Sequence, residues 1–508
     1  MRIPLVDRFL DGITMYRLML YGLSLIAFAA IVFGFLGVLS YSGLALLVSL
    51  GVLFVSAYAS NFILAKLYGV TTNAESSAIT ALILFFLFMP ATSAKEFAVL
   101  VLAAVIAMAS KYVLAYRGRH LFNPVAVAAV VFGFSATSAA IWWVATPTLL
   151  PYTLLFGFLV VRKIERFALV GSFTALALIG VGVMGVQAGM TAMQIVQLAF
   201  VSWPIIFFST VMLTEPITTP PRQKLQAAYG AIVGVIFSSQ LHIGPFFATP
   251  ELALIIGNIF SYAVSSKERL TLVFKEKRRL ANDIYEFVFT PNRKMAFKPG
   301  QYAEWTLAHN PSDTRGNRRY FTIASSPTEH EMLLGVRLLA EGGSSFKKSL
   351  YEMKKGDTLY AGQFAGDFTL PADPIKKLVF IAGGIGVTPF RSMLAYLRDT
   401  KQKRDIVMLY SCKTPEDVAY EKFFRDISEV VGLQLVCTVT DAGTSGTWTG
   451  EQGMIDAGFV KRAIPDFTER HFFISGPPMM VKGIDTSLRA MGVTRNKITT
   501  DFFPGFGG

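Results

Sequence analysis

The clearest chemical pattern in the sequence is a glycine-rich turn, FIAGGIGVTP, at residues 380–389. An apolar run typical of a β-strand leads into this turn, and a helical pattern follows it from Phe390. Glycine permits a tight turn and close approach of backbone N–H groups to phosphate oxygens, and a helix N-terminus favours negative charge. The pattern therefore predicts a pyrophosphate-binding site. The residues expected to build it are Gly383, Gly384, Gly386, Thr388 and Pro389.

Two patterns further upstream also suit a phosphate-bearing group. The first is RYFTIAS at residues 319–325, where the arginine fork can pair with two phosphate oxygens at once. The second is GGSS at residues 342–345, whose small side chains leave backbone N–H groups accessible. The residues expected to take part are Arg319, Tyr320, Phe321, Thr322, Gly342, Gly343, Ser344 and Ser345.

The last pattern of this half is SGPPMM at residues 475–480, followed by the tail Asp501-Phe502-Phe503. Taken in this order, the four patterns of residues 267–508 resemble those of the ferredoxin–NADP⁺ reductase superfamily. The resemblance implies that Arg319 pairs with the pyrophosphate of FAD. It also implies that the aromatic ring of that motif stacks on the isoalloxazine and that the Thr322 hydroxyl lies near its N5.

The same resemblance assigns the nicotinamide side of the site. Ser475 stands where the family carries a cysteine beside the nicotinamide, with Gly476 and Pro477 following it. The tail is expected to bring Asp501 or Phe502 to the flavin face. The stretch 410–417 contains one lysine and no arginine cluster for a 2′-phosphate, which favours NADH over NADPH without deciding between them.

These motifs require two kinds of scaffold. From Arg269 the chain reads as short strands with turn signals, and from about Pro374 strands and helices alternate. The predicted fold is therefore a β-barrel FAD-binding domain at residues 267–373 and an α/β, Rossmann-like NAD(P)H-binding domain at residues 374–508.

The first half of the chain has a different composition. Of the 508 residues 53% are hydrophobic, and long apolar runs dominate up to about Val264. A helix of roughly 20 apolar residues crosses a bilayer. The sequence thus predicts a polytopic α-helical membrane domain at residues 1–266 with about ten spans. The apolar runs lie at 18–39, 43–65, 77–91, 96–115, 124–141, 149–161, 167–187, 191–213, 225–241 and 251–265.

The loops between these runs predict an orientation. With the N-terminus inside, basic residues gather in inner segments, whereas the outer loops hold Lys95 alone. The net charge of +13 is therefore interpreted as a topology signal and not as a nucleic-acid-binding surface. We expect a multi-pass protein of a bacterial inner (cytoplasmic) membrane with its reductase module in the cytoplasm. The inner basic residues include Arg17, Lys66, Lys111, Arg119, Arg162, Lys163, Arg166, Arg222 and Lys224.

Three loop motifs of the membrane half carry more information than hydropathy does. They are SAITAL at 77–82, GRHLFNP at 118–124 and FFSTVMLTEP at 207–216. In order and spacing they resemble the flavin-carrying membrane subunits of the sodium-pumping NADH:quinone reductase (its B subunit) and of the Rnf complex (its D subunit). That resemblance, over roughly residues 15–265, implies membrane-bound flavin near Asn123, Pro124, Thr214 and Glu215. Glu215 stands where the family usually has aspartate.

In that family an FMN is esterified to a threonine on the outer side of the membrane. Two segments match its motif in part: Ala145-Thr146-Pro147 and Ser135-Ala136-Thr137. Thr146 is favoured, because it lies in a predicted outer loop and precedes a proline as in the family. Neither segment has the family's upstream aspartate, so non-covalent FMN stays an alternative. The neighbouring Trp142 and Trp143 are interpreted as interfacial aromatic residues.

The two halves together predict an NAD(P)H-dependent flavin oxidoreductase. Electrons would pass from cytoplasmic NAD(P)H through FAD to membrane flavin, and on to an extracytoplasmic acceptor or a quinone. A redox-driven Na⁺ or H⁺ pump is one alternative. A haem-bearing oxidase or ferric reductase is another, although the membrane half offers only His120 and His242 as histidine ligands. No Cys-x-x-Cys spacing exists, and the two cysteines predict neither a metal site nor a disulfide framework.

Overall fold

The computed structural model divides the chain into two compact units, one of residues 1–265 and one that begins at Ser266. The second unit runs to the C-terminus. The structure describes residues 6, 9–10, 13–69, 74–116, 119–135, 139–239, 242–243, 246–265, 269–309, 313, 317–338, 343–441, 448 and 450–501.

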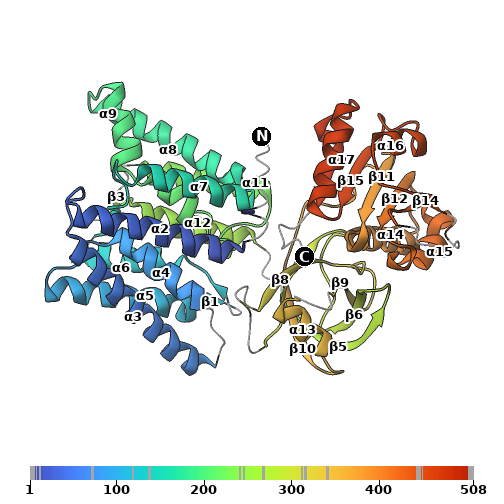
Figure 1. Cartoon of the computed structure of the whole chain (residues 1–508), viewed down its shortest axis with the longest axis horizontal. Helices are drawn as coiled ribbons and strands as arrows, with labels where there is room; N and C mark the ends of the chain where they lie inside the picture. Colours follow the sequence, from blue (N-terminus) through green and yellow to red (C-terminus); the bar gives the residue numbers. More distant parts are fainter. Residues whose placement is uncertain are drawn as a thin grey trace. The chain divides into compact units, whose positions relative to one another are not determined.

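Unit 1 is helical (Figure 1). All ten predicted apolar runs contain helix, and several of the helices begin at a recognisable capping residue. For example, Ser93 and Glu96 form a reciprocal capping box at the start of one helix. The helices are α2 (Met15–Phe35), α3 (Gly43–Tyr68), α4 (Ala74–Leu87), α5 (Ala94–Val113), α6 (Pro124–Ser135), α7 (Leu150–Ile164), α8 (Phe167–Gln187), α9 (Ala192–Gln197), α10 (Ile205–Phe207), α11 (Gln223–Phe237) and α12 (Pro250–Val264). Two π-helical turns, η1 (Leu198–Ser202) and η2 (Phe208–Met212), and four two-residue strands, β1 (Ala115–Tyr116), β2 (Arg119–His120), β3 (His242–Ile243) and β4 (Phe246–Phe247), complete the unit.

Four of these helices, α2, α3, α5 and α8, are long and apolar enough to cross a membrane. A fifth candidate is the pair Ala192–Ser202 and Ile205–Met212, which is bent by 51°. The sequence predicts a span at 191–213, and the structure has a break within it, because Pro204 has no N–H to donate. The remaining helices are shorter, so ten crossings stay a prediction.

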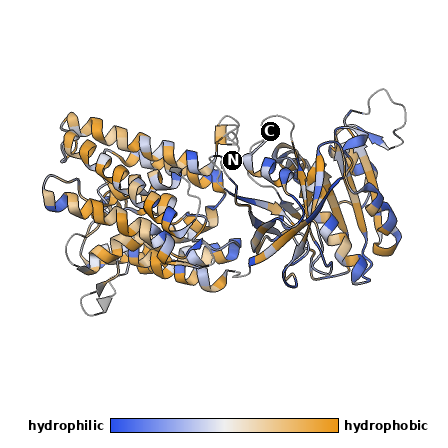
Figure 2. Cartoon of the chain, turned by 90° about the horizontal axis from the view of Figure 1, so that it is seen from below, coloured by the Kyte–Doolittle hydropathy of each residue, from blue (hydrophilic) through white to orange (hydrophobic). Residues whose placement is uncertain are grey.

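The surface and the packing of unit 1 both suit an apolar environment. Its helices are coloured as hydrophobic over most of their length in Figure 2, and large apolar side chains such as Phe28, Val55 and Val186 are 65%, 71% and 70% exposed. On α11, Gly230 and Gly234 allow close approach of α8, because a Cβ at Gly230 would lie 2.3 Å from the Leu169 carbonyl oxygen. Small residues at such spacing are how membrane helices pack closely.

Unit 2 begins with a six-stranded antiparallel sheet in the order β8-β7-β10-β5-β6-β9. A backbone hydrogen bond of 3.0 Å from Ala324 N to Leu333 O links the ends of its two edge strands. A fully buried tryptophan, Trp305, lies in its core. The elements are β5 (Arg269–Arg279), β6 (Ile284–Pro291), β7 (Tyr302–Thr306), β8 (Arg318–Thr322), β9 (Met332–Arg337), α13 (Ser345–Glu352) and β10 (Thr358–Ala365).

The rest of unit 2 is a parallel α/β sheet in the order β14-β13-β12-β11-β15-β16. The central strand β11 is buried along its whole length, as expected for a strand covered on both faces. The elements are β11 (Leu378–Gly383), η3 (Gly384–Val387), α14 (Thr388–Asp399), β12 (Ile406–Cys412), η4 (Pro415–Asp417), α15 (Glu421–Val431), β13 (Leu433–Val439), β14 (Glu451–Gln452), α16 (Ala457–Ala463), β15 (His471–Ser475), α17 (Pro478–Ala490), η5 (Arg495–Lys497) and β16 (Ile498–Asp501).

Candidate functional site

The three residues predicted to be catalytic come together in unit 2. Ser475 ends β15 and Asp501 ends β16, and the two are direct partners in the parallel register. The Thr322 hydroxyl, at the end of β8, donates a hydrogen bond to the Asp501 carboxylate. Thr322 and Ser475 are both buried. Residues from both sheets of unit 2 thus meet at one point.

The Asp501 carboxyl has an unusual protonation equilibrium. Burial raises its pKa to about 7, and the hydrogen bond from Thr322 opposes part of that rise. A carboxyl that titrates near neutral pH can hold or release a proton at the working pH of a cell. Asp501 therefore suits a proton-handling role beside Thr322.

A second cluster gathers at the N-terminus of α13. The Asp313 carboxylate accepts a hydrogen bond of 2.8 Å from Arg319 Nη2 and one of 3.1 Å from the Ser345 backbone N–H. Ser344 is the N-cap of the same helix and accepts a hydrogen bond from Lys347 N. A carboxylate of the chain thus occupies an anion site made of an arginine and a helix N-terminus. These donors fit a pyrophosphate such as that of FAD.

Strand alternation separates the other residues of the RYFT motif. Phe321 turns towards the barrel core, where its ring lies 5.8 Å from that of Phe346. Tyr320 lies on the opposite face, 38% exposed, and its hydroxyl donates a 2.9 Å hydrogen bond to Glu304. Tyr320 therefore shares a strand face with Thr322 and is the better placed of the two rings to stack on a flavin. Of the two glycines predicted here, Gly343 is described and Gly342 lies outside the described residues.

The glycine-rich turn forms the third cluster. Gly384 has φ of +52°, a conformation that favours glycine. A Cβ on Gly386 would lie 2.6 Å from the backbone N and Cα of Gly476, so the turn packs directly against the SGPP segment. Thr388 begins α14 with Pro389 at its second position, and the Thr388 hydroxyl donates to the Ile385 carbonyl oxygen. The close approach leaves backbone N–H groups at a helix N-terminus, as a dinucleotide pyrophosphate requires.

One residue that supports this turn is missing from the sequence-based prediction. Tyr410 of β12 is 1% exposed, and its hydroxyl donates a 3.1 Å hydrogen bond to the Gly384 carbonyl oxygen. It also accepts a 3.2 Å hydrogen bond from Ala419 N. A tyrosine inside a buried strand must find partners for its hydroxyl, which is the signal that could have identified it. The predicted tail residue Phe502 lies outside the described residues.

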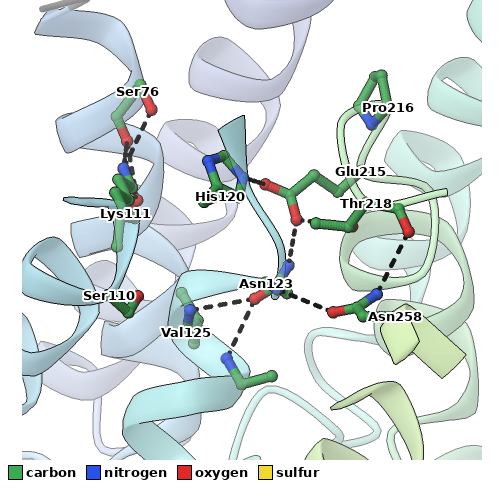
Figure 3. A network of polar contacts seen from close by, with 12 residues as sticks. Ser76, Ser110, Lys111, His120, Asn123, Val125, Glu215, Pro216, Thr218 and Asn258 are labelled. Atoms are coloured by element: carbon green, nitrogen blue, oxygen red, sulfur yellow. Dashed lines mark hydrogen bonds and ion pairs between the residues drawn. The ribbon is translucent and has the colours of Figure 1, made fainter. Parts of the chain in front are cut away.

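Unit 1 holds a separate polar network around Glu215 (Figure 3). Glu215 contacts His120 Nε2 at 3.1 Å, Asn123 Nδ2 at 3.1 Å and the Thr218 hydroxyl at 3.0 Å. Asn258 from α12 accepts a 2.9 Å hydrogen bond from Asn123 N. The structure thus joins two of the three loop motifs, 118–124 and 207–216, through partly buried polar side chains.

Some of these motif residues also stabilise the local backbone. Asn123 Oδ1 caps α6 by accepting from Val125 N and Ala126 N, and Pro124 is the first residue of that helix. The Thr214 hydroxyl turns back onto the Thr210 carbonyl oxygen at 2.7 Å, so it does not enter the Glu215 network. In the third motif, 77–82, the Thr80 hydroxyl accepts a 2.9 Å hydrogen bond from Lys111.

Thr146 lies apart from this network. Its hydroxyl oxygen is buried and has no hydrogen-bond partner in the part of the chain that the structure describes. The adjacent Trp142 and Trp143 are each only 4% exposed, so their interpretation as interfacial residues is wrong. Phe85, Phe86 and Tyr41 surround the Trp143 ring, which explains its burial. The alternative residue Thr137 lies outside the described residues.

Comparison with known proteins identifies one domain of unit 2. Residues 380–486 match the family described as the oxidoreductase NAD-binding domain. The chain is 29% identical over 217 residues to the glycine betaine monooxygenase reductase subunit of Chromohalobacter salexigens, covering 41% of this chain and 57% of that protein. It is 26% identical over 288 residues to the xylene/toluene monooxygenase electron transfer component of Pseudomonas putida, covering 55% and 78%.

Solved structures of the same kind align with the chain at low similarity. The flavohaem-like FAD/NAD-binding domain of nitric oxide dioxygenase from Vibrio cholerae O1 biovar El Tor aligns with a TM-score of 0.41 and 21% identity, covering 46% of this chain and 98% of that one. The chain spans 57% to 60% of the length of the glycine betaine monooxygenase reductase subunits. The C-terminal half therefore contains an oxidoreductase NAD-binding domain, and it is similar in sequence to reductase and electron-transfer components.

Proposed function

We propose that the chain is a membrane-embedded NAD(P)H:flavin oxidoreductase that passes electrons from the cytoplasm towards the outer face of a bacterial inner membrane. In this assignment residues 1–266 are the membrane domain, 267–373 bind FAD and 374–508 bind NAD(P)H. The observation that carries the proposal is the convergence of Thr322, Ser475 and Asp501 at the ends of three strands. The dinucleotide supplies a hydride and the flavin releases electrons one at a time.

The residues of unit 2 would bind and orient these groups. Arg319 and the N-terminus of α13 hold the FAD pyrophosphate, because they already bind an internal carboxylate. The turn at 383–387 holds the dinucleotide pyrophosphate, and the hydrogen bond from Tyr410 to the Gly384 carbonyl oxygen fixes the position of Gly384. Thr322 and Ser475 supply hydroxyls beside the reacting rings, and Asp501 holds a proton through Thr322. NADH is the preferred donor in this proposal.

In this proposal, unit 1 would carry the electrons onward from FAD. The Glu215 network joins two of the motif segments that resemble those of the flavin-carrying membrane subunits, through the contact of Asn123 with Glu215. The unpartnered Thr146 hydroxyl supports a role in holding FMN, covalently or not. An extracytoplasmic protein or a quinone would then take the electrons. Exposed apolar side chains on α2, α3 and α8 support placement in a lipid bilayer.

Anaerobic mixing of the full-length protein with NADH in detergent tests the first step. We expect rapid bleaching of the flavin absorbance in the wild type and slow bleaching in Thr322→Val. Thr358→Val, on the exposed side of β10, is the matched control and should bleach at the wild-type rate. A wild-type flavin that NADH and NADPH both fail to reduce would contradict the proposal.

A further inference from the structure

The two sheets of unit 2 are joined by α14 through buried polar contacts. Arg391 Nη1 donates a 3.2 Å hydrogen bond to the Ala324 carbonyl oxygen, and the Ser392 hydroxyl donates a 2.6 Å bond to the Ser325 carbonyl oxygen. Arg391 also forms an ion pair with Glu329. The residues that α14 holds lie two and three positions after Thr322 in the chain.

Arg391 is the central cation of this junction. It is 8% exposed, and the fully buried Ser392, Ser325 and Ser326 lie around it. The carboxylates that face it are Glu329 and Glu286, and Glu286 also accepts a 2.9 Å hydrogen bond from the Tyr420 hydroxyl. Other charged or aromatic groups at the junction are Arg278, Arg398, Asp399 and the Phe423 ring.

The charge balance makes this arginine difficult to replace. Burial raises the pKa of Glu286, and the charge of Arg391 offsets part of that rise. Arg278, the other cation near Glu286, has a side chain that is 48% exposed and reaches it at 3.5 Å. Loss of a buried partner leaves an uncompensated charge, which is far more destabilising than loss of an exposed pair.

The position of Arg391 along α14 connects this junction to both cofactor sites. The helix begins at Thr388, directly after the glycine-rich turn, and Arg391 lies one turn later. At the other end of the contact, Ala324 and Ser325 continue from the strand that presents Thr322. A rigid helix therefore links the turn at 383–387 to the residue expected at the flavin.

We propose that Arg391 is a positioning residue that fixes the distance between the nicotinamide and flavin sites by locking α14 onto the Ala324–Ser325 backbone. This proposal rests on the proposed function of unit 2. A displacement of about 1 Å in the reacting atoms lowers a rate by roughly a hundredfold. One guanidinium nitrogen, Nη1, donates to both the Ala324 carbonyl oxygen and Glu329, and a lysine keeps the charge on a shorter side chain of different shape.

The test compares Arg391→Met, Arg391→Lys and the control Arg398→Met in the full-length protein. Arg398 is on the same helix and lies 4.0 Å from the same Glu329, but its side chain is 36% exposed. We would measure FAD content, thermal unfolding, the KM for NADH and the rate of flavin reduction at saturating NADH. Arg391→Met should lower the saturated rate by roughly a hundredfold with a KM within about threefold of wild type. Arg391→Lys should recover part of the rate, and Arg398→Met should match the wild type.

Three results would overturn the proposal. The first is an unchanged saturated rate in Arg391→Met with normal FAD content. The second is a rate loss that follows FAD loss alone, and the third is a rate loss that Arg398→Met shares. If Arg391→Met does not fold, Ser392→Ala and Arg391→Lys carry the test, because each removes one link and keeps the buried charge; wild-type rates in both would refute it. A wild-type protein whose FAD is not reduced by NADH would instead refute the proposed function.

Discussion

The two units of this chain place their polar residues in different ways. In unit 2, Thr322, Ser475 and Asp501 sit at strand ends, where sheet topology brings distant segments to one edge. In unit 1, Glu215 and Asn123 sit where helices begin or break, next to Pro216 and Pro124. The order of the strands in the sheets therefore positions the residues of the reductase site, whereas the ends of helices position the residues of the Glu215 network. Residues at helix ends also serve as caps, so their role is harder to recognise.

The largest expected effect comes from Asp501→Asn in unit 2. We expect the rate of flavin reduction by NADH at neutral pH to fall roughly a hundredfold or more, because proton transfer by a positioned side chain contributes that much. The wild-type rate should also change with an apparent pKa near 7, and the variant should lose that dependence. Stopped-flow absorbance over roughly pH 5 to 9 measures both the rate of flavin reduction and its pH dependence. A variant that keeps the wild-type rate and pH profile would remove Asp501 from the site.

The next effect concerns the glycine-rich turn. Gly386→Ala would place a Cβ 2.6 Å from the Gly476 backbone, so the turn or the SGPP segment must move. We expect the KM for NADH to rise about tenfold or more, since displacement of an oriented binding group is costly. Gly483→Ala on α17 is the control, because its added Cβ meets nothing within 4 Å. Equal KM values in the two variants would contradict the assigned turn.

A smaller and more selective effect is expected in unit 1. Glu215→Gln removes the charge that His120, Asn123 and Thr218 surround. We expect transfer of electrons from reduced FAD to the membrane acceptor to slow about tenfold, the scale of a lost buried charge-assisted hydrogen bond. The NADH-to-FAD step should keep its wild-type rate. Glu96→Gln, in an exposed capping box, should leave both steps unchanged. A slower NADH-to-FAD step in Glu215→Gln would contradict the assignment of separate roles to the two units.

The smallest effect is on stability. The folded-state pKa of Asp501, about 7, exceeds its ordinary value of 3.8, so the native state binds the proton more tightly. The unfolding free energy should therefore decrease as pH rises between these values, by up to about 1.4 kcal/mol per pH unit from this group. Asp501→Asn should lose this part of the slope. Calorimetry of both proteins at several pH values measures it, and parallel slopes would contradict the assigned burial.

Much of unit 2 could be predicted from sequence because its motifs are local and ordered. The turn at 380–389 specifies strand, turn and helix within ten residues, and the structure has all three. Strand alternation, by contrast, decides which of Tyr320 and Phe321 faces Thr322, and the motif alone does not state the face. The sequence does not predict the role of Tyr410, because its partner, the Gly384 carbonyl, lies in the turn that follows another strand.

In unit 1 the sequence predicted helices better than their ends. Hydropathy located all ten runs, yet it could not foresee the bend at Pro204 or the burial of Trp142 and Trp143. Both depend on tertiary packing, since a tryptophan near a loop can face lipid or fill a core. The bond between Asn123 and Glu215 spans 92 residues of sequence, so no local pattern reveals it.

The most direct test of the central claim is a flavin count on the purified full-length protein. Acid denaturation separates flavin that is released from flavin that stays on the chain. A path that uses both units predicts at least about two flavins per chain. We expect FAD in the released fraction, FMN as the second flavin, and loss of any retained FMN in Thr146→Ala. A single released FAD and no other flavin would contradict electron transfer through unit 1.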